Sequence, residues 1–339
     1  MSLMPGSTLI VGCGYLGGRV ADALTLGGRP VFALTRARAD ELTARGIRPI
    51  LGDVTDPGSL QQLPEVERVV YAVGMDRSAG KSMREVYVGG LRNVLAALPG
   101  SPRFTYVSST GVYGQTSGEW VTEESATDPT EESGKVVLEA EQALREVRPD
   151  ATILRFAGIY GPGRLLRKQP LLKGDPYVGD ADKFLNLIHV ADGVRAVLAA
   201  ESYRMARVRD GRQGDVFPPL PAGERSATQL PGEGSSLLEN QNKSPHPVAS
   251  QPTSPQRGEV FPPPPGRTFN IADGTPVSRR DFYTHLAQLL AAPPARFEPS
   301  PTPAVEPNRR VATGAARVAL DFAPEFPTFA EGLAASLES

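Results

Sequence analysis

The sequence predicts an α/β fold: a doubly wound parallel sheet with a small C-terminal lobe and a disordered, proline-rich insertion. Short apolar segments alternate with amphipathic helical segments over the first 160 residues, and a glycine-rich loop directly follows the first apolar segment. Strands that are apolar along their whole length are typical of parallel sheets covered by helices on both faces.

The alternation defines the expected elements and two regions. Strands are expected at Thr8–Val11, Val31–Leu34, Pro49–Leu51, Arg68–Val73, Phe104–Ser108 and Thr152–Phe156, and helices at Leu16–Leu26, Met83–Ala97 and Lys135–Val147. After Tyr160 the pattern becomes less regular, with strands at Leu187–Val190 and Phe269–Ala272 and helices at Ala191–Ala200 and Arg279–Leu290. We therefore expect residues 1–160 to form the sheet domain. Residues 161–202 and 267–339 form the lobe, with some of its strands returning to the sheet.

Residues 203–266 have the composition of a disordered insertion. This segment contains 12 Pro and 7 Gly in 64 residues, few large apolar residues and no period. Such a segment buries too little surface to offset the entropy of ordering it. The sequence Gly-Asp-Val-Phe-Pro-Pro at 214–219 recurs as Gly-Glu-Val-Phe-Pro-Pro at 258–263. The functional alternative is a proline-rich segment that docks a partner.

Overall composition excludes several classes of protein. The net charge is −2, so nothing indicates the clustered basic surface of a nucleic-acid-binding protein. No apolar run is long enough for a membrane span, and residues 1–7 do not resemble a secretory signal. A single cysteine, Cys13, rules out an internal disulfide and fits a reducing, cytoplasmic setting. Three histidines, one of them in the insertion, predict no metal cluster.

The glycine-rich loop predicts a dinucleotide site. It reads, in order, Gly12, Cys13, Gly14, Tyr15, Leu16 and Gly17, which is G-x-G-x-x-G between a strand and a helix. In this motif Gly12 allows the tight turn, Gly14 lets the pyrophosphate approach the backbone, and Gly17 lets the helix pack on the strand. The positive end of the helix dipole then faces the phosphates. The loop therefore predicts a Rossmann-type domain that binds NAD or NADP.

The end of the second strand favours NADP over NAD. NAD-preferring sites place an acid about 20 residues after the loop, where it binds the ribose 2′-hydroxyl. Here Arg36 and Arg38 occupy that region, and no acid precedes Asp40. An arginine can pair with the 2′-phosphate of NADP, although two solvated surface arginines remain the alternative. Asp53, after the third strand, is either an acceptor for the adenine amino group or a loop-start cap.

Several further motifs resemble those of the extended short-chain dehydrogenase/reductase superfamily, of the NAD-dependent epimerase/dehydratase type. In chain order they are Val107–Gly114, Val121–Glu124, Asp128-Pro129, Arg155–Arg164, Asn186–Asp192, Phe269–Asp273 and Pro276–Ser278. The resemblance spans nearly the whole chain except the insertion. It implies an NAD(P)-dependent oxidoreductase or epimerase that acts on a small carbonyl or nucleotide-sugar-type substrate.

The resemblance also implies catalytic residues, with one departure. The family uses a Ser or Thr, a Tyr that passes a proton, and a Lys four residues later that lowers the pKa of the Tyr and holds the cofactor ribose. Ser109 matches the Ser and Lys135 the Lys, but Glu131 stands where the Tyr is expected. Glu131 is either a general base or a helix-terminal acid favoured by the dipole. The departure leaves a non-catalytic NADP-binding sensor or interaction protein as the alternative.

The expected substrate contacts come from several motifs. They are Thr110, Tyr113, Arg164, Asn186 and His189. Thr110 lies at the carboxyl end of a predicted strand, where ligands bind in parallel sheets. His189 lies in an apolar strand, so a packed structural histidine is the competing interpretation. We expect a small-molecule substrate, no nucleic-acid or membrane partner, and leave a homodimer open.

Overall fold

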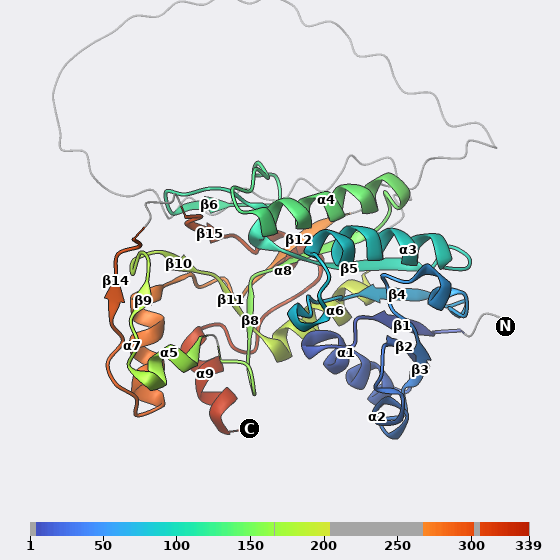
Figure 1. The fold of residues 1–339 in the computed structure, drawn as a ribbon, viewed down its shortest axis with the longest axis horizontal. Coiled ribbons are helices and arrows are strands. Elements are labelled where there is room, and N and C mark those ends of the chain that lie inside the picture. The colour runs from blue at the N-terminus through green and yellow to red at the C-terminus, as the bar shows by residue number, and fades with distance from the viewer. Residues whose placement is uncertain (1–4, 166, 204–266, 302–305, 339) are drawn as a thin grey trace, which may run out of the picture. The chain divides into compact units, whose positions relative to one another are not determined.

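A computed structural model describes residues 5–165, 167–203, 267–301 and 306–338. The centre of the fold is a seven-stranded parallel sheet with the order β12-β7-β5-β4-β1-β2-β3 (Figure 1). Strands β1 (Thr8–Val11), β2 (Val31–Thr35) and β3 (Arg48–Leu51) run outward to one edge. The strand order reverses between β1 and β4, which is where open α/β sheets bind ligands.

The other half of the sheet contains β4 (Arg68–Tyr71), β5 (Arg103–Ser109), β7 (Thr152–Phe156) and β12 (Thr268–Ile271). All of its neighbouring pairs are parallel, and β12 pairs with β7 from Thr268 opposite Ile153 onward. The strand expected at 269–272 in the C-terminal region therefore closes the sheet edge. The doubly wound parallel sheet predicted from the sequence is confirmed.

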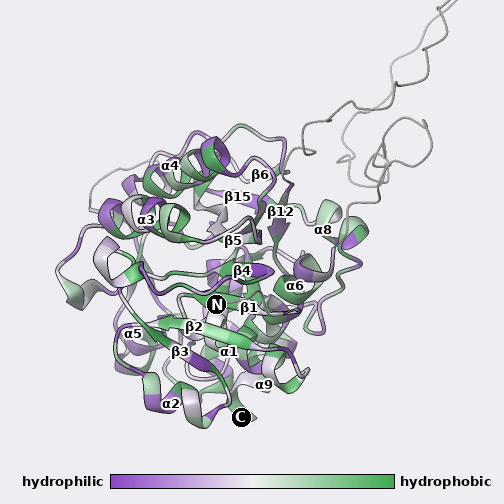
Figure 2. Ribbon diagram, turned by 90° about the vertical axis from the view of Figure 1, so that its right-hand side faces the viewer, coloured by the Kyte–Doolittle hydropathy of each residue, from purple (hydrophilic) through white to green (hydrophobic). Residues whose placement is uncertain are grey.

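Helices cover both faces of the sheet, as its apolar strands require (Figures 1 and 2). On one face α1 (Tyr15–Leu26), α6 (Val190–Ser202) and α8 (Gly314–Ala319) contribute to one buried cluster. On the other face α3 (Gly90–Ala97) and α4 (Glu132–Val147) pack over a second cluster. The strands β1, β2 and β4 are buried almost throughout because each side meets a helix, whereas the edge strand β3 is partly exposed.

A third hydrophobic cluster lies in the C-terminal region. It joins α5 (Lys168–Lys173), α7 (Arg279–Leu289) and α9 (Phe329–Glu338) around buried aromatic residues such as Tyr177 and Phe282. Four two-stranded pairings accompany it, formed by β6 (Glu119–Val121), β8 (Gly158–Tyr160), β9 (Tyr177–Val178), β10 (Phe184–Leu185), β11 (Leu187–His189), β13 (Val277–Ser278), β14 (Phe297–Glu298) and β15 (Arg309–Val311). These short pairs tie distant segments together beside the main sheet.

The expected elements agree with the observed ones to within a few residues, with informative exceptions. The helix expected over 83–97 contains a π-helical turn at Glu85–Gly89 before α3. The short helix α2 (Ala39–Ala44) was not predicted, and of the short strands outside the main sheet only β11, expected at Leu187–Val190, was predicted. The insertion predicted at 203–266 lies outside the described residues, apart from Tyr203, whose ring packs on Phe269. In the part of the chain that the structure describes, no helix is long and apolar enough to cross a membrane.

Candidate functional site

A cleft of about 520 Å³ opens at the carboxyl ends of the strands, at the reversal point between β1 and β4. Four segments contribute most of its wall: the glycine loop, the end of β2, the start of the loop after β3, and the loop after β4. The lining residues are Gly12–Tyr15, Leu34–Arg38, Gly52–Thr55, Val73–Asp76, Ala79, Lys81, Val86 and Arg164. The cleft thus lies where the sequence predicted a dinucleotide.

Two glycines of the loop are required by the protein itself. Gly12 has a φ of +95°, and a Cβ there would lie 2.5 Å from the backbone of Ala72. A Cβ on Gly17 would lie 2.1 Å from the carbonyl oxygen of Gly12. Both positions are therefore closed to any side chain, Gly12 because the chain after β4 passes directly beside it and Gly17 because helix α1 starts against the turn. These are the two roles that the motif assigns to them.

Gly14 differs, since a Cβ there would meet no atom within 4 Å. It is the N-cap residue of α1, no side chain caps this helix, and its first turn contains no acid. The amides and dipole of the first turn consequently face the cleft, where a phosphate would bind. The neighbouring Leu16 is buried in the core, and the hydroxyl of Tyr15 donates to the Pro162 carbonyl at 3.0 Å.

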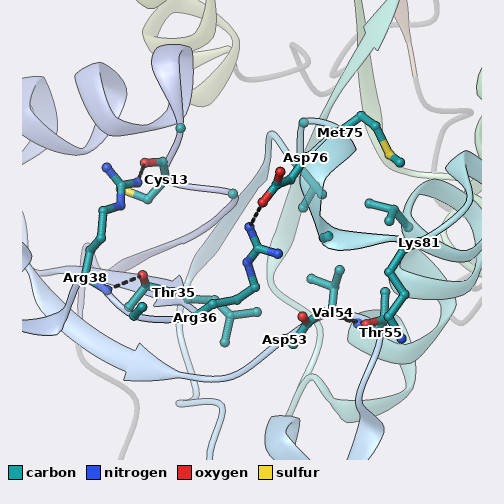
Figure 3. Close-up of a pocket in the computed structure, with 18 of the residues that line it drawn as sticks. Cys13, Thr35, Arg36, Arg38, Asp53, Val54, Thr55, Met75, Asp76 and Lys81 are labelled. Atoms are coloured by element: carbon teal, nitrogen blue, oxygen red, sulfur yellow. Dashed lines mark hydrogen bonds and ion pairs between the residues drawn. The ribbon is translucent and has the colours of Figure 1, made fainter.

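The charges around the cleft favour an anion. Arg36, Arg38, Lys81 and Arg164 line it, against two carboxylates, Asp53 and Asp76. The two arginines after β2 lie in the wall of the cleft and not on a remote surface (Figure 3). Arg36 donates to Asp76 at 2.6 Å, and Arg38 donates to the carbonyl of Cys13. Two guanidinium groups thus line the part of the cleft where the sequence predicted a contact with a 2′-phosphate.

Asp53 acts as a loop-start cap while also lining the cleft. Its Oδ1 accepts from both the backbone N–H and the hydroxyl of Thr55, each at 2.8 Å. Burial opposes its ionisation, but these hydrogen bonds outweigh burial and lower the pKa of Asp53. The Oδ1 atom of Asp53 therefore caps the loop, as one interpretation expected. The contact of Asp53 with adenine stays a prediction.

The predicted catalytic residues gather at the end of β5, outside the residues that line the cleft. Ser109 ends β5, and its Oγ accepts from the N–H of Gly111 at 3.1 Å. Glu131 is the N-cap residue of α4, Lys135 lies on the first turn, and both are exposed. The turn after β5 and the start of α4 touch closely, because a Cβ on Gly134 would lie 2.3 Å from the Gly111 carbonyl.

An arginine that the sequence did not single out also reaches this place. Arg309 of β15 donates through Nη2 to the carbonyl of Thr110 at 2.7 Å. Its Nε is buried without a hydrogen-bond partner among the described residues. Burial lowers the pKa of Arg309, and the negative charge of Glu131 partly offsets that effect. A cation from the C-terminal region thus lies beside the predicted catalytic residues.

Two predicted substrate residues are instead engaged within the fold. Tyr113 is fully buried, and its hydroxyl donates to Asn270 at 2.9 Å. The side-chain amide of Asn186 donates to the carbonyl of Arg309, and its oxygen accepts from the N–H of Val311. In this arrangement the polar groups of both side chains form hydrogen bonds that hold segments of the chain together.

The remaining predicted substrate residues divide between the core and the cleft. His189 is 5 % exposed, and its Nδ1 accepts from the N–H of Ala191 as the cap of α6. Burial lowers the pKa of His189, which agrees with the packed, structural interpretation. Thr110 is also buried, at the start of a short 3-10 turn. Arg164 lines the cleft, and its guanidinium lies 5.3 Å from the centroid of the Tyr15 ring.

A buried carboxyl, Asp273, lies two residues after the end of β12. It is 1 % exposed, its Oδ1 accepts from the N–H of Thr275, and its Oδ2 has no partner among the described residues. Burial, together with the nearby charge of Asp192, raises the pKa of Asp273 to about 7, from an ordinary value of 3.8. At a pH between these two values the folded protein therefore holds a proton here that the unfolded chain releases.

This proton makes stability depend on pH. Between about pH 4 and about pH 7 the folded state binds one more proton than the unfolded state, so the free energy of unfolding falls as the pH rises. Asp273→Asn keeps the acceptor for Thr275 and should remove this slope. Urea unfolding at several pH values measures it. Asp182→Asn, an exposed aspartate, is the control, and an unchanged slope in Asp273→Asn would contradict the assignment.

Sequence reasoning missed residues for two different reasons. Val73, Gly74 and Met75 follow β4 at the same sheet edge, so the carboxyl-end rule alone could have found them. Arg309 carried no such signal, because its contact with Thr110 joins positions 199 residues apart.

Comparisons with known proteins agree with this geometry. The profile of the NAD dependent epimerase/dehydratase family matches residues 8–214. MoeE5, solved in complex with UDP-glucuronic acid and NAD, shares 21 % identity over 98 % of both chains with a TM-score of 0.67. The UDP-glucose 4-epimerase of Thermotoga maritima, solved with UDP-glucose, shares 17 % identity over 98 % of this chain and 97 % of its own, with a TM-score of 0.67.

A third structure is more similar in sequence. A provisionally assigned NAD-dependent epimerase/dehydratase from Methylobacillus flagellatus shares 27 % identity over 99 % of this chain and 98 % of its own, with a TM-score of 0.65. Among curated proteins, none matches this chain significantly. The solved structures share the fold of the described residues, and the family profile covers the cleft and the predicted catalytic residues.

Proposed function

The chain belongs to the NAD dependent epimerase/dehydratase family, and we propose that it is an NADP-preferring oxidoreductase or epimerase for a nucleotide-sugar-type substrate. The observation that carries the proposal is the glycine loop. Gly12 and Gly17 are closed to side chains by the protein, whereas Gly14, which lines the cleft at the uncapped start of α1, has no atom within 4 Å of a Cβ. That combination fits a pyrophosphate.

The preference for NADP rests on the end of β2. Arg36 and Arg38 line the cleft where NAD-preferring proteins carry an acid. A guanidinium pairs with a phosphate through two parallel hydrogen bonds, and the 2′-phosphate is what distinguishes NADP from NAD. MoeE5 was solved with NAD. The affinities of this chain for NADP and NAD therefore have to be compared directly.

The chemistry would take place between the end of β5 and the start of α4. A bound nicotinamide dinucleotide supplies a hydride donor or acceptor. In our proposal the hydroxyl of Ser109 orients the substrate oxygen, Lys135 holds the cofactor ribose, and Glu131 moves the proton that the family's Tyr would move. The substrate class follows MoeE5 and the Thermotoga maritima epimerase, which were solved with UDP-sugars.

The role of Glu131 is tested by removing its charge. Glu131→Gln should lower kcat by about 100-fold, because a positioned base contributes at least that much. Its neighbour Glu132 is also an exposed acid at the start of α4, so Glu132→Gln is the matched control and should leave kcat unchanged. Turnover is measured from the NADPH absorbance for net oxidation or reduction, and from the amount of converted sugar for epimerisation, which leaves the cofactor unchanged overall. Equal rates in the two variants would remove Glu131 from the mechanism.

The complete proposal is tested with two assays on the wild-type protein. NADPH fluorescence should change on binding, and some UDP-sugar or small carbonyl compound should be converted. Binding without turnover over a broad panel would favour the alternative, a non-catalytic NADP-binding sensor, for which the Glu at position 131 is the supporting observation. Lack of binding to both NADPH and NADH would reject the proposed function.

A further inference from the structure

One ion pair crosses the candidate cofactor cleft. Arg36, directly after β2, donates through Nη2 to Oδ2 of Asp76, in the loop after β4, at 2.6 Å. Figure 3 shows the two side chains reaching toward each other from opposite walls, above Asp53 and Val54. The pair joins positions 40 residues apart and belongs to the two segments that flank the reversal point of the sheet.

Asp76 is held so that one oxygen faces the arginine. Its Oδ1 accepts from the N–H and the hydroxyl of Ser78, at 3.0 and 2.6 Å, which caps the turn that follows. Oδ2 is therefore presented to Arg36 by a fixed carboxylate. Hydrogen bonds from Ser78 and from Arg36 lower the pKa of Asp76 to about 2, so it is ionised at neutral pH.

We propose that Asp76 sets the selectivity between NADP and NAD by competing with the 2′-phosphate of NADP for Arg36. The inference rests on the proposed function, since it assumes that the cleft holds a dinucleotide. In the free protein and with NAD, the carboxylate neutralises the guanidinium. With NADP the phosphate must take the guanidinium from Asp76, and it must also approach a carboxylate of like charge. Asp76 therefore weakens NADP binding and leaves NAD binding nearly unaffected.

Competition of this kind is physically reasonable because the ion pair is accessible. The side chains of Arg36 and Asp76 are 52 % and 42 % exposed, so water and salt screen their attraction. A 2′-phosphate carries more charge and can bind the guanidinium through two hydrogen bonds. The arginine can therefore change partners, because breaking its ion pair with Asp76 costs less free energy than its contact with the phosphate provides.

The test is Asp76→Asn, because an Asn side chain keeps the oxygen that caps the turn and removes the charge. Titrations of NADPH and NADH, followed by fluorescence, should give an NADPH Kd about fivefold lower than in the wild type. The NADH Kd should change by less than about twofold. Asp56→Asn is the matched control: Asp56 caps the turn at Pro57–Leu60 in the same way, outside the cleft, and should change neither Kd.

A second background shows whether the effect passes through the arginine. Arg36→Ala should weaken NADPH binding by about tenfold, and adding Asp76→Asn to it should then change the NADPH Kd by less than about twofold. The probes 2′,5′-ADP and 5′-AMP should behave like NADPH and NADH: Asp76→Asn should lower the Kd of 2′,5′-ADP, which carries the 2′-phosphate, and leave that of 5′-AMP nearly unchanged. An unchanged ratio of NADPH to NADH affinity in Asp76→Asn, with both cofactors bound by the wild type, would overturn this inference alone. Absence of all dinucleotide binding would reject the proposed function with it.

Discussion

Gly14→Val should still fold, with some loss of stability, and lose NADPH binding by roughly 100-fold, equivalent to about 2.7 kcal/mol. A Cβ at this position meets no atom within 4 Å, so the first carbon of the valine has room, but the backbone at φ −83° and ψ −143° lies outside the regions that β-branched residues prefer. Its added carbons extend into the cleft, between the first turn of α1 and an approaching pyrophosphate. Fluorescence titration measures the affinity, and thermal unfolding checks the fold.

Gly17 provides the contrast that makes this result specific. A Cβ there would lie 2.1 Å from the Gly12 carbonyl, so Gly17→Ala should destabilise the fold and lower the melting temperature markedly. Within the same loop, Gly17 is therefore required for packing, and Gly14 is expected to be required for binding the ligand. Wild-type affinity for NADPH in a folded Gly14→Val variant would mean that the pyrophosphate binds elsewhere.

Sequence patterns predicted the strands, the helices and the glycine loop, because each of these depends on residues that are close together in the sequence. The alternation of apolar strands and helices gave β1 and β7 with their observed bounds, because burial on both faces leaves a continuous apolar run. The spacing of Gly12, Gly14 and Gly17 located the cleft for the same reason, since the turn, the close approach and the helix start lie within six residues.

The candidate site beyond the cleft depends on contacts between distant segments, and there residue type was a poor guide. Asn186 has a side chain that could bind a substrate. Its amide N–H and its oxygen instead form hydrogen bonds with the backbone of Arg309 and Val311. The arrival of Arg309 beside Thr110 has the same origin. A polar side chain reveals its role only when its long-range partner is known, and no local period encodes that partner.

Another arrangement of this kind is a buried polar network formed by residues of β5, α4 and β7. Arg155 of β7 donates to both carboxylate oxygens of Glu141 of α4, at 3.0 and 2.7 Å, and these side chains are 7 % and 3 % exposed. Ser108 donates to Glu141 at 2.5 Å, and Arg155 also donates to the hydroxyl of Tyr113. Each charge is thus compensated inside the protein, which is the condition for burying it.

Glu141→Gln should lower the free energy of unfolding by about 3–5 kcal/mol, because it leaves the Arg155 guanidinium buried without its counter-charge. Glu139, on the same helix, forms a partly exposed pair with Arg84 at 3.1 Å, so Glu139→Gln should cost less than about 1 kcal/mol. Urea unfolding measures both values. Replacing both charges, as Glu141→Leu with Arg155→Met, should restore much of the loss, since no buried charge is left unpaired. If Glu141→Gln cost no more than Glu139→Gln, water would have to reach the guanidinium, and Tyr113 would then lie near a second, solvated cavity rather than in the core.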